Sequence, residues 1–210
     1  MNLITPFRGI RPQVKFAKKI SSPNISYLDN FKFSKNKNFL NILNNPNISY
    51  ANKILKKLKK NKIIFQDKKD NYYLYRITFQ KKCLLGIVGK INLKNYDDKK
   101  ILGHEETFPE RIKKRKQQLI RFNTQISPIY TAYKLNKLSL STLKNLFKFK
   151  PNYKFISNDK CKHELWVIED KDKQSKVQKY LNKINKLYIC DGHHRLQAML
   201  KSKEKISPMI

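Results

Sequence analysis

The sequence has few cysteines, and none of them form a recognisable pair. Cys83, Cys161 and Cys190 are odd in number and far apart, and no Cys-x-x-Cys motif occurs. A disulfide framework and a zinc ribbon both need paired cysteines, so the sequence excludes both. This pattern is typical of a protein in a reducing compartment, and we expect a cytoplasmic location.

Long apolar runs are also absent. The longest, residues 83–89, is much shorter than the roughly 20 residues that a membrane-spanning helix needs. The chain reaches Pro6 and Arg8 before any long apolar run, so we expect no secretory signal. We therefore expect no membrane partner. The sequence contains no internal repeat.

Acidic residues are scarce, with 15 Asp and Glu against 47 Lys and Arg, and the formal net charge is +32. Such a charge is typical of nucleic-acid binding. However, 40 of the 47 cations are lysine, and Lys, Asn and Ile, which share A/T-rich codons, fill 84 of 210 positions. Lysines spread through every segment indicate solvated faces. We therefore expect non-specific nucleic-acid binding at low salt.

Arginine is correspondingly rare, and each of the seven arginines is informative. Its planar fork of donors suits phosphate and carboxylate groups better than lysine does. Arg8, Arg11, Arg115 and Arg195 fall in stretches that stand out for other reasons, so all four are candidate ligand contacts. The alternative is that an arginine pairs with a structural carboxylate.

The apolar pattern predicts one α+β domain over residues 1–210, with a mixed sheet, hairpins and flanking helices. Two apolar runs, residues 71–79 and 83–91, are separated by three polar residues and predict a β-hairpin. Further strands are expected over residues 127–134, 162–169 and 187–190. Helices are expected over residues 38–43, 50–60, 107–122, 138–149 and 175–184, and after Gly192.

The stretch from 187 to 200, LYICDGHHRLQAML, carries the most unusual chemistry. A short apolar strand stops at Asp191-Gly192, and a helix follows with apolar residues at i, i+3 and i+4. The positive end of this helix favours an anion. Five residues lie at that end: Asp191, Gly192, His193, His194 and Arg195. The alternative interpretation is a tight turn in which Asp191 caps the helix and the histidines lie on the surface.

A second cluster, Gly103-His104-Glu105-Glu106-Thr107, precedes a basic helix. The helical zinc motif of metalloproteases would need a second histidine where Phe108 stands, so that interpretation fails. Glu105 and Glu106 can bind Mg²⁺ or act as a general base beside a phosphate. Alternatively, the carboxylates complement the helix dipole and Thr107 caps the helix.

Near the amino terminus, Pro6 and Pro12 bracket an extended segment that contains Arg8, Gly9 and Arg11. A bend at the glycine would bring both arginines to one face, where they can close over a bound phosphate. The alternative is a basic amino-terminal arm.

Together these motifs resemble a widespread bacterial family labelled domain of unknown function 1015. The resemblance rests on Pro6-Phe7-Arg8-Gly9-Ile10-Arg11-Pro12, His104-Glu105, Thr107, Pro109, Arg115, Pro128-Ile129-Tyr130, His163-Glu164-Leu165-Trp166-Val167 and Asp191-Gly192-His193-His194-Arg195. The chain departs from the family at Ser22-Pro23-Asn24-Ile25, where Pro-Pro-Tyr-Asp is usual, and at Lys114, where an acid is usual. Family members also continue well beyond the last motif. We therefore expect this chain to match the amino-terminal part of a longer architecture.

The last motif also resembles the phosphate-binding box of the chromosome-partitioning and sulfiredoxin-like superfamily, which includes free-serine kinases. Gly192, Arg195 and Ala198 match the Gly-x-x-Arg-x-x-Ala spacing of the partitioning proteins. Sulfiredoxin's reactive cysteine would fall on His193, which excludes that chemistry. The resemblance implies a strand-turn-helix that binds phosphate.

These observations predict a protein that binds a nucleotide or a phosphorylated small molecule. The reaction class that we expect is phosphoryl transfer, by a phosphotransferase that uses ATP or a similar nucleotide with Mg²⁺. Asp191, Gly192, His194 and Arg195 would hold the phosphates together with Arg8, Arg11 and Arg115. His193, Glu105 and Glu106 are the candidate catalytic residues. The alternatives are a DNA-associated regulator, an inactive remnant, and metal binding by Cys190, His193 and His194, which no ligand spacing supports.

Overall fold

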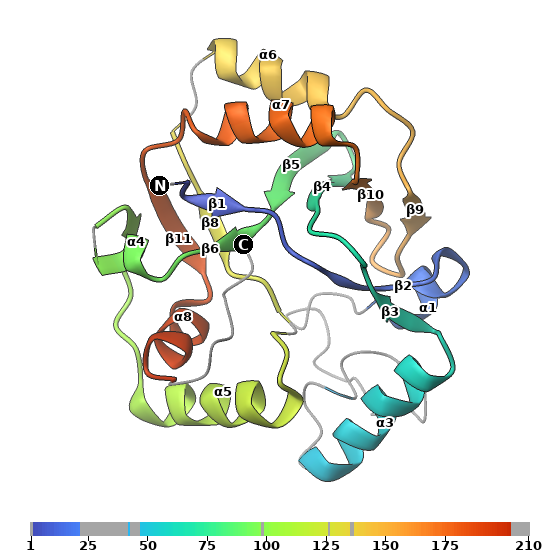
Figure 1. The fold of residues 1–210 in the computed structure, drawn as a ribbon, viewed down its shortest axis with the longest axis vertical. Coiled ribbons are helices and arrows are strands. Elements are labelled where there is room, and N and C mark those ends of the chain that lie inside the picture. The colour runs from blue at the N-terminus through green and yellow to red at the C-terminus, as the bar shows by residue number, and fades with distance from the viewer. Residues whose placement is uncertain are drawn as a thin grey trace.

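The structure is a computed structural model and describes residues 2–21, 42, 47–97, 99–125, 127–134 and 137–202. The predicted α+β class with a mixed set of sheets is confirmed (Figure 1). The strands are Ile4–Thr5 (β1), Ile10–Pro12 (β2), Ile64–Gln66 (β3), Tyr72–Phe79 (β4), Lys82–Val88 (β5), Lys90–Ile91 (β6), Ile101–Leu102 (β7), Tyr130–Ala132 (β8), Tyr153–Ile156 (β9), Lys162–Ile168 (β10) and Leu187–Asp191 (β11). The helices are Val14–Phe16 (η1), Ala17–Ile20 (α1), Ile48–Lys60 (α3), Lys94–Asp97 (α4), Pro109–Phe122 (α5), Lys137–Leu146 (α6), Lys171–Leu181 (α7) and His193–Leu200 (α8).

An antiparallel four-stranded sheet, in the order β5-β4-β10-β9, contains the predicted hairpin. β4 and β5 pair from Tyr73 with Val88 to Phe79 with Lys82, and Gln80 turns the chain with φ 52°. The second predicted run is interrupted at Gly89, where a Cβ atom would lie 2.3 Å from the Ile4 side chain. The chain beyond Gly89 therefore forms β6, which pairs with β1.

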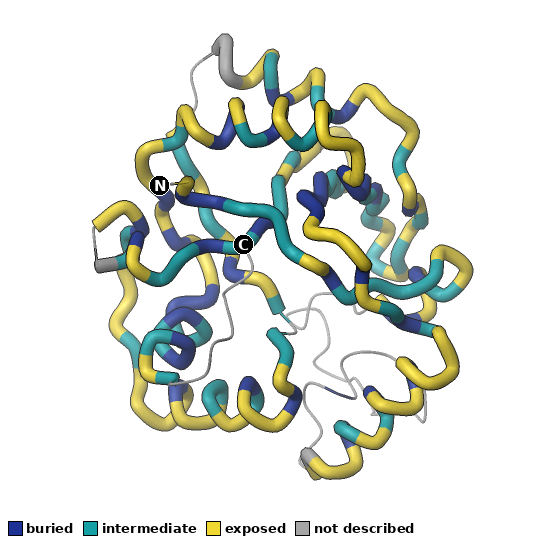
Figure 2. The backbone as a smooth tube through the Cα atoms, in the orientation of Figure 1, coloured by how far each residue is buried: buried dark blue, intermediate teal, exposed yellow. Residues whose placement is uncertain are grey.

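The side chains of this sheet alternate between two cores, as the period of two in a strand requires. Tyr72, Leu74 and Trp166 belong to the main core, which also contains the buried faces of α6 and α7 (Figures 1 and 2). Tyr73 and Val167 point to the opposite face and pack in a smaller core with α1. Neighbouring tyrosines on β4 thus serve packing on both faces.

Several predicted boundaries shift. The predicted helix over residues 50–60 is confirmed as α3, whose buried Leu55 and Leu58 join a core with β3. The helix predicted from residue 107 begins at Pro109, because proline fixes φ and lacks the N–H that the first turn leaves unpaired. The interpretation of Thr107 as its cap is therefore wrong. The remaining predicted segments, residues 127–134, 138–149, 162–169 and 175–184, are observed as β8, α6, β10 and α7, and residues 38–43 lie outside the described residues except for Ile42.

A three-stranded sheet positions the candidate site. β11 lies in its centre, parallel to β7 and antiparallel to β8. Its alternate residues Leu187 and Ile189 are buried, so the strand is anchored in the main core. The carboxyl ends of β7 and β11 and the amino end of β8 meet at one edge of this sheet. Three distant chain segments, residues 103–108, 127–129 and 191–195, therefore converge there.

Candidate functional site

The junction between β11 and α8 has the strand-turn-helix form that the sequence predicts. Gly192 is the N-cap of α8, with φ 103° and ψ 21°, a left-handed conformation that side chains other than glycine rarely adopt. Since the N-cap residue is Gly192, it has no side chain that could cap the helix. The alternative interpretation, in which Asp191 is the helix cap, is therefore wrong. The first N–H groups of α8 have no acceptor within the helix.

Arg195 closes one side of the junction. It donates from Nη1 to the Pro128 carbonyl oxygen at 2.7 Å and from Nη2 to the Asp191 carboxylate. Its guanidinium lies directly over Gly192, where an added Cβ would stand 3.0 Å from Nε. Glycine is therefore required at position 192 both for its backbone conformation and for the space that Arg195 fills.

His193 is 4% exposed and lies beneath the segment that follows β7. Its Nε2 accepts the backbone N–H of His104 at 3.3 Å, so the neutral ring carries its proton on Nδ1. Nδ1 lies 2.9 Å from Glu105 Oε2, yet the alignment is not that of a hydrogen bond. The Glu105 side chain is 57% exposed. The pair thus joins a buried imidazole to a carboxylate in contact with solvent.

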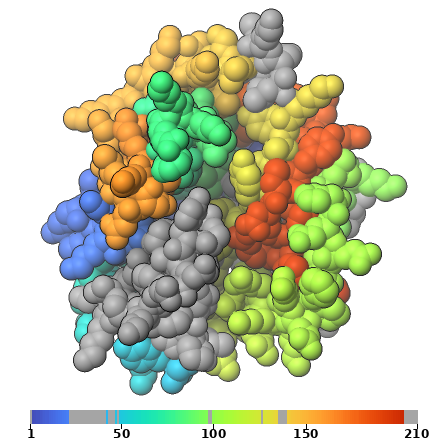
Figure 3. All heavy atoms as spheres, turned by 180° about the vertical axis from the view of Figure 1, so that it is seen from behind, coloured from blue at the N-terminus to red at the C-terminus, as the bar shows by residue number. Residues whose placement is uncertain are grey.

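His194 holds the same segment at a second point. Its Nε2 accepts the backbone N–H of Phe108 at 3.1 Å, and its ring stacks on Phe108 with centroids 5.9 Å apart. Gly103 allows the backbone after β7 to approach the His193 ring closely, because a Cβ atom at position 103 would lie 3.1 Å from that ring. The two histidines therefore fix residues 103–108 against the start of α8, and Figure 3 shows these segments together at the surface beside α5.

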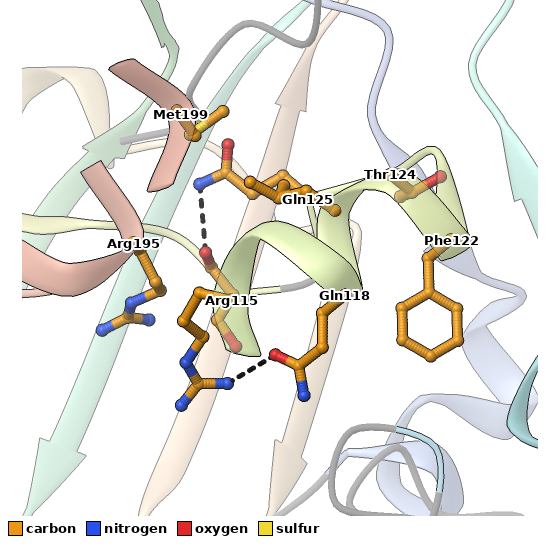
Figure 4. Close-up of a pocket in the computed structure, with 9 residues that line it drawn as sticks. Arg115, Gln118, Phe122, Thr124, Gln125, Arg195 and Met199 are labelled. Carbon is orange, nitrogen blue, oxygen red and sulfur yellow. Dashed lines mark hydrogen bonds between the residues drawn. The ribbon is translucent and has the colours of Figure 1, made fainter. Parts of the chain in front are cut away.

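α5 and α8 pack together through Ile112, Leu119, Ala198 and Met199, and a pocket lies between the two helices beside this contact. Its volume is ≈ 40 Å³, and it is lined by Arg115, Gln118, Leu119, Phe122, Thr124, Gln125, Ser127, Arg195 and Met199. The guanidinium groups of Arg115 and Arg195 lie side by side in it (Figure 4). Arg115 donates from Nη1 to Gln118 Oε1 at 2.8 Å. Burial lowers the pKa of Arg115, Arg195 lowers it further, and Asp191 raises it.

Three predicted site residues are not part of this arrangement. Glu106 is exposed and makes no hydrogen bond or ion pair with the residues that the structure describes. Arg8 and Arg11 belong to the segment around β2, which lies on the opposite side of the molecule from α8 (Figure 1). Arg8 is 4.0 Å from Asp70, and both side chains are largely exposed.

Arg11 has structural partners instead. Its Nε donates to both oxygens of the buried Asp67 carboxylate, at 2.8 and 3.0 Å, and its Nη2 lies 2.8 Å from Oδ1. Its Nη1 donates to Tyr153 Oη at 2.7 Å. Tyr73 Oη donates to the same carboxylate at 2.6 Å and accepts the Gly9 N–H at 2.7 Å. These hydrogen bonds therefore hold residues 6–12 against the four-stranded sheet. The alternative interpretation, that an arginine pairs with a structural carboxylate, is correct for Arg11.

Some lining residues were not predicted. Gln118, Thr124, Gln125 and Ser127 complete the pocket, and the Pro128 carbonyl accepts from Arg195. The spacing of Arg115 and Gln118, three residues apart on one helix, is the only sequence signal for this wall. Thr124, Gln125, Ser127 and Pro128 are positioned by the pairing of β8 with β11, which no local sequence pattern predicts.

Within the described ranges, no group of three or more His, Cys, Asp or Glu side chains comes together as a metal site. No helix in the same part of the chain is long and apolar enough to cross a membrane.

The fold and the junction define an α+β protein with an uncapped strand-to-helix turn beside two arginines. Residues 4–208 match the family described as "Protein of unknown function (DUF1015)". The chain belongs to this family, as its motifs predict. Comparisons with curated proteins and with solved structures gave no match.

Proposed function

We propose that this protein binds a nucleotide or a phosphorylated small molecule at the β11–α8 junction. The observation that carries the proposal is the uncapped amino-terminal end of α8 at Gly192, with the Arg195 guanidinium directly over it. Free N–H groups and the helix dipole favour an anion at this point. The resemblance of the last motif to the phosphate-binding box of the partitioning proteins, through Gly192, Arg195 and Ala198, supports the same proposal.

Arg195 keeps binding capacity in this arrangement. A guanidinium has five N–H donors, and two of them are directed to Pro128 and Asp191. Those two contacts orient the group, so less conformational entropy is lost when a phosphate oxygen accepts from the others. Asp191 and Arg195 thus act together, the first as the positioning residue for the second.

The reaction class that fits the surrounding groups is phosphoryl transfer. This chemistry needs mainly positioning and neutralisation of charge. Glu105 Oε2 lies 2.9 Å from Nδ1 of the buried His193, and in this proposal the exposed Glu105 carboxylate accepts a proton from the attacking hydroxyl group. A nucleotide would bring Mg²⁺ on its phosphates, with Glu105 as the carboxylate ligand, since Mg²⁺ is usually held by one or two carboxylates plus phosphate oxygens.

Isothermal calorimetry with ATP, ADP and inorganic phosphate tests the proposal. We expect binding by the wild type and at least a 10-fold weaker Kd for Arg195→Ala, because a hydrogen bond to a charged group is lost. Arg121→Ala is the matched control, because it removes an exposed arginine of α5 outside the junction. Absence of binding by the wild type, or equal binding by both variants, would overturn the proposal.

The charge of +32 supports a second candidate, binding of nucleic acid. A lysine-coated surface releases counterions from any polyanion, so its binding should be indiscriminate and should disappear at moderate salt. A DNA-associated regulator would instead keep a preference for some sequence as salt rises. Duplex binding measured at two ionic strengths, with two unrelated sequences, separates these outcomes.

A further inference from the structure

The pocket between α5 and α8 contains more positive than negative charge. Arg115 and Arg195 both line it, and Asp191 is the carboxylate that acts on both of them. Asp191 already accepts from Arg195. Arg115, by contrast, makes a single hydrogen bond, to the neutral Gln118, among the residues that the structure describes. Within the described part of the chain, the pair of guanidinium groups therefore has Asp191 as its one carboxylate partner.

Such an arrangement is unfavourable without a ligand. A partly buried cation loses hydration, and a like charge beside it adds repulsion. Both effects act on Arg115, since burial and the neighbouring Arg195 each lower its pKa. Arginine nevertheless stays protonated at any physiological pH. A doubly charged anion between the two groups would remove the repulsion and would accept from their remaining donors.

The pocket is small. The space in it that the centre of a water-sized sphere can reach is ≈ 40 Å³, whereas about 10–15 Å³ is enough to hold one water molecule. The pocket therefore has room for a few water molecules or for one tetrahedral anion, and a base or a sugar is larger. Gln118, Thr124, Gln125 and Ser127 add polar groups to the lining, and Leu119, Phe122 and Met199 close its apolar side.

We infer that the Arg115–Arg195 pocket binds one terminal phosphoryl group, and that the ligand of this protein enters by its phosphate end with the remainder outside the pocket. The inference rests on the proposed function and adds Arg115 to the ligand contacts. It also assigns the ligand to a chemical class, a phosphomonoester or the last phosphate of a nucleotide. Free inorganic phosphate shares this chemistry and is distinguished below.

The experiment compares wild type with Arg115→Gln, Arg115→Lys and the control Lys114→Gln. Lys114 is the exposed neighbour of Arg115 on α5, so its removal changes the net charge equally without touching the pocket. Calorimetry at constant ionic strength uses inorganic phosphate, glycerol 3-phosphate and acetate as probes. We expect Arg115→Gln to weaken phosphate binding by 10-fold or more and Arg115→Lys to weaken it less, because lysine keeps the charge and loses the fork. Lys114→Gln should change binding less than two-fold.

The outcomes separate the two proposals. If the wild type binds neither phosphate nor glycerol 3-phosphate, the pocket inference fails, and the proposed function fails with it only if ATP and ADP do not bind either. If it binds them and both Arg115 variants bind equally well, the pocket inference fails and the proposed function stands. A loss of the same size in Lys114→Gln, or equal affinity for acetate, would also overturn the pocket inference. Tighter binding of glycerol 3-phosphate than of phosphate identifies an organic phosphate as the ligand, and the reverse order identifies the free ion. Circular dichroism shows whether Arg115→Gln folds. If it does not, the affinity of Arg115→Lys for phosphate tests the pocket inference in its place.

Discussion

Replacement of Arg11 by methionine should destabilise the protein without weakening phosphate binding. Arg11 donates from Nε to both carboxylate oxygens of Asp67, whose side chain is only 5% exposed, and its guanidinium stacks over Phe65 at 4.6 Å. Methionine keeps most of the apolar stem but leaves a buried carboxylate without its cation. Tyr73 still donates to Asp67, yet a neutral hydroxyl group cannot balance the charge. Removal of one partner of a buried ion pair typically costs about 3–5 kcal/mol.

Urea unfolding followed by circular dichroism measures this loss, and thermal unfolding gives an independent value. For a chain of this size, each kcal/mol lowers Tm by about 2–4 °C, so the expected decrease is about 6–20 °C. Arg8→Met is the matched control. Arg8 lies 4.0 Å from Asp70, and both side chains are largely exposed. We therefore expect the free energy of unfolding to change by no more than about 0.5 kcal/mol.

The double variant Arg11→Met/Asp67→Leu completes the test. Removal of both charges should restore part of the stability that the single variant loses, because no unpaired carboxylate remains in the interior. The structural role of Arg11 would be refuted if the free energy of unfolding of the single variant lies within about 1 kcal/mol of that of the wild type. It would also be refuted if Arg11→Met weakens phosphate binding as Arg195→Ala does while stability is unchanged.

Two further predictions concern pH and the β11–α8 turn. Burial lowers the pKa of His163 below its ordinary value of about 6.5, although Asp159 opposes the shift. The neutral ring therefore contributes stability above pH 6.5. This contribution is lost as the pH falls from 6.5 through the lowered pKa. Urea unfolding between pH 5 and pH 8 should therefore show a fall in stability below about pH 6.5 that is reduced in His163→Gln, and identical slopes in both proteins would contradict the assignment. Gly192→Ala should cost about 1–3 kcal/mol and displace the Arg195 guanidinium, with weaker phosphate binding. Gly86→Ala, where the nearest atom is 3.9 Å from the added Cβ, should behave as wild type in both assays.

Local patterns predicted the elements whose signal lies in consecutive residues. The hairpin of β4 and β5, the helix α3 and the turn at Gly192 were all recognised in this way. Their boundaries moved where one residue overrides periodicity, as Pro109 does at the start of α5. β3 and β9 were missed because each is short. β3 owes its conformation to pairing with the distant β2, whereas β9 pairs with the next strand, β10.

The candidate site was predicted in part for the same reason. His193, Arg195 and Glu105 come together as the motifs suggested, through contacts across the edge of one sheet. Arg11 was assigned to the ligand because its true partner, Asp67, lies 56 residues away in sequence and carries no local signal. Residue type indicates what a side chain can bind, whereas only the tertiary fold decides which partner it meets.

The central position of β11 has a consequence for how this protein folds. The hydrogen bonds that bring the walls of the junction together link residues 67 and 89 positions apart, and each depends on the last strand and helix of the described chain. Contacts over such distances form slowly, because loop closure must precede them. During synthesis, the junction can assemble only after residues 187–200 have left the ribosome. A ligand that binds there would therefore favour, by mass action, chains in which β11 and α8 have formed over chains in which they have not.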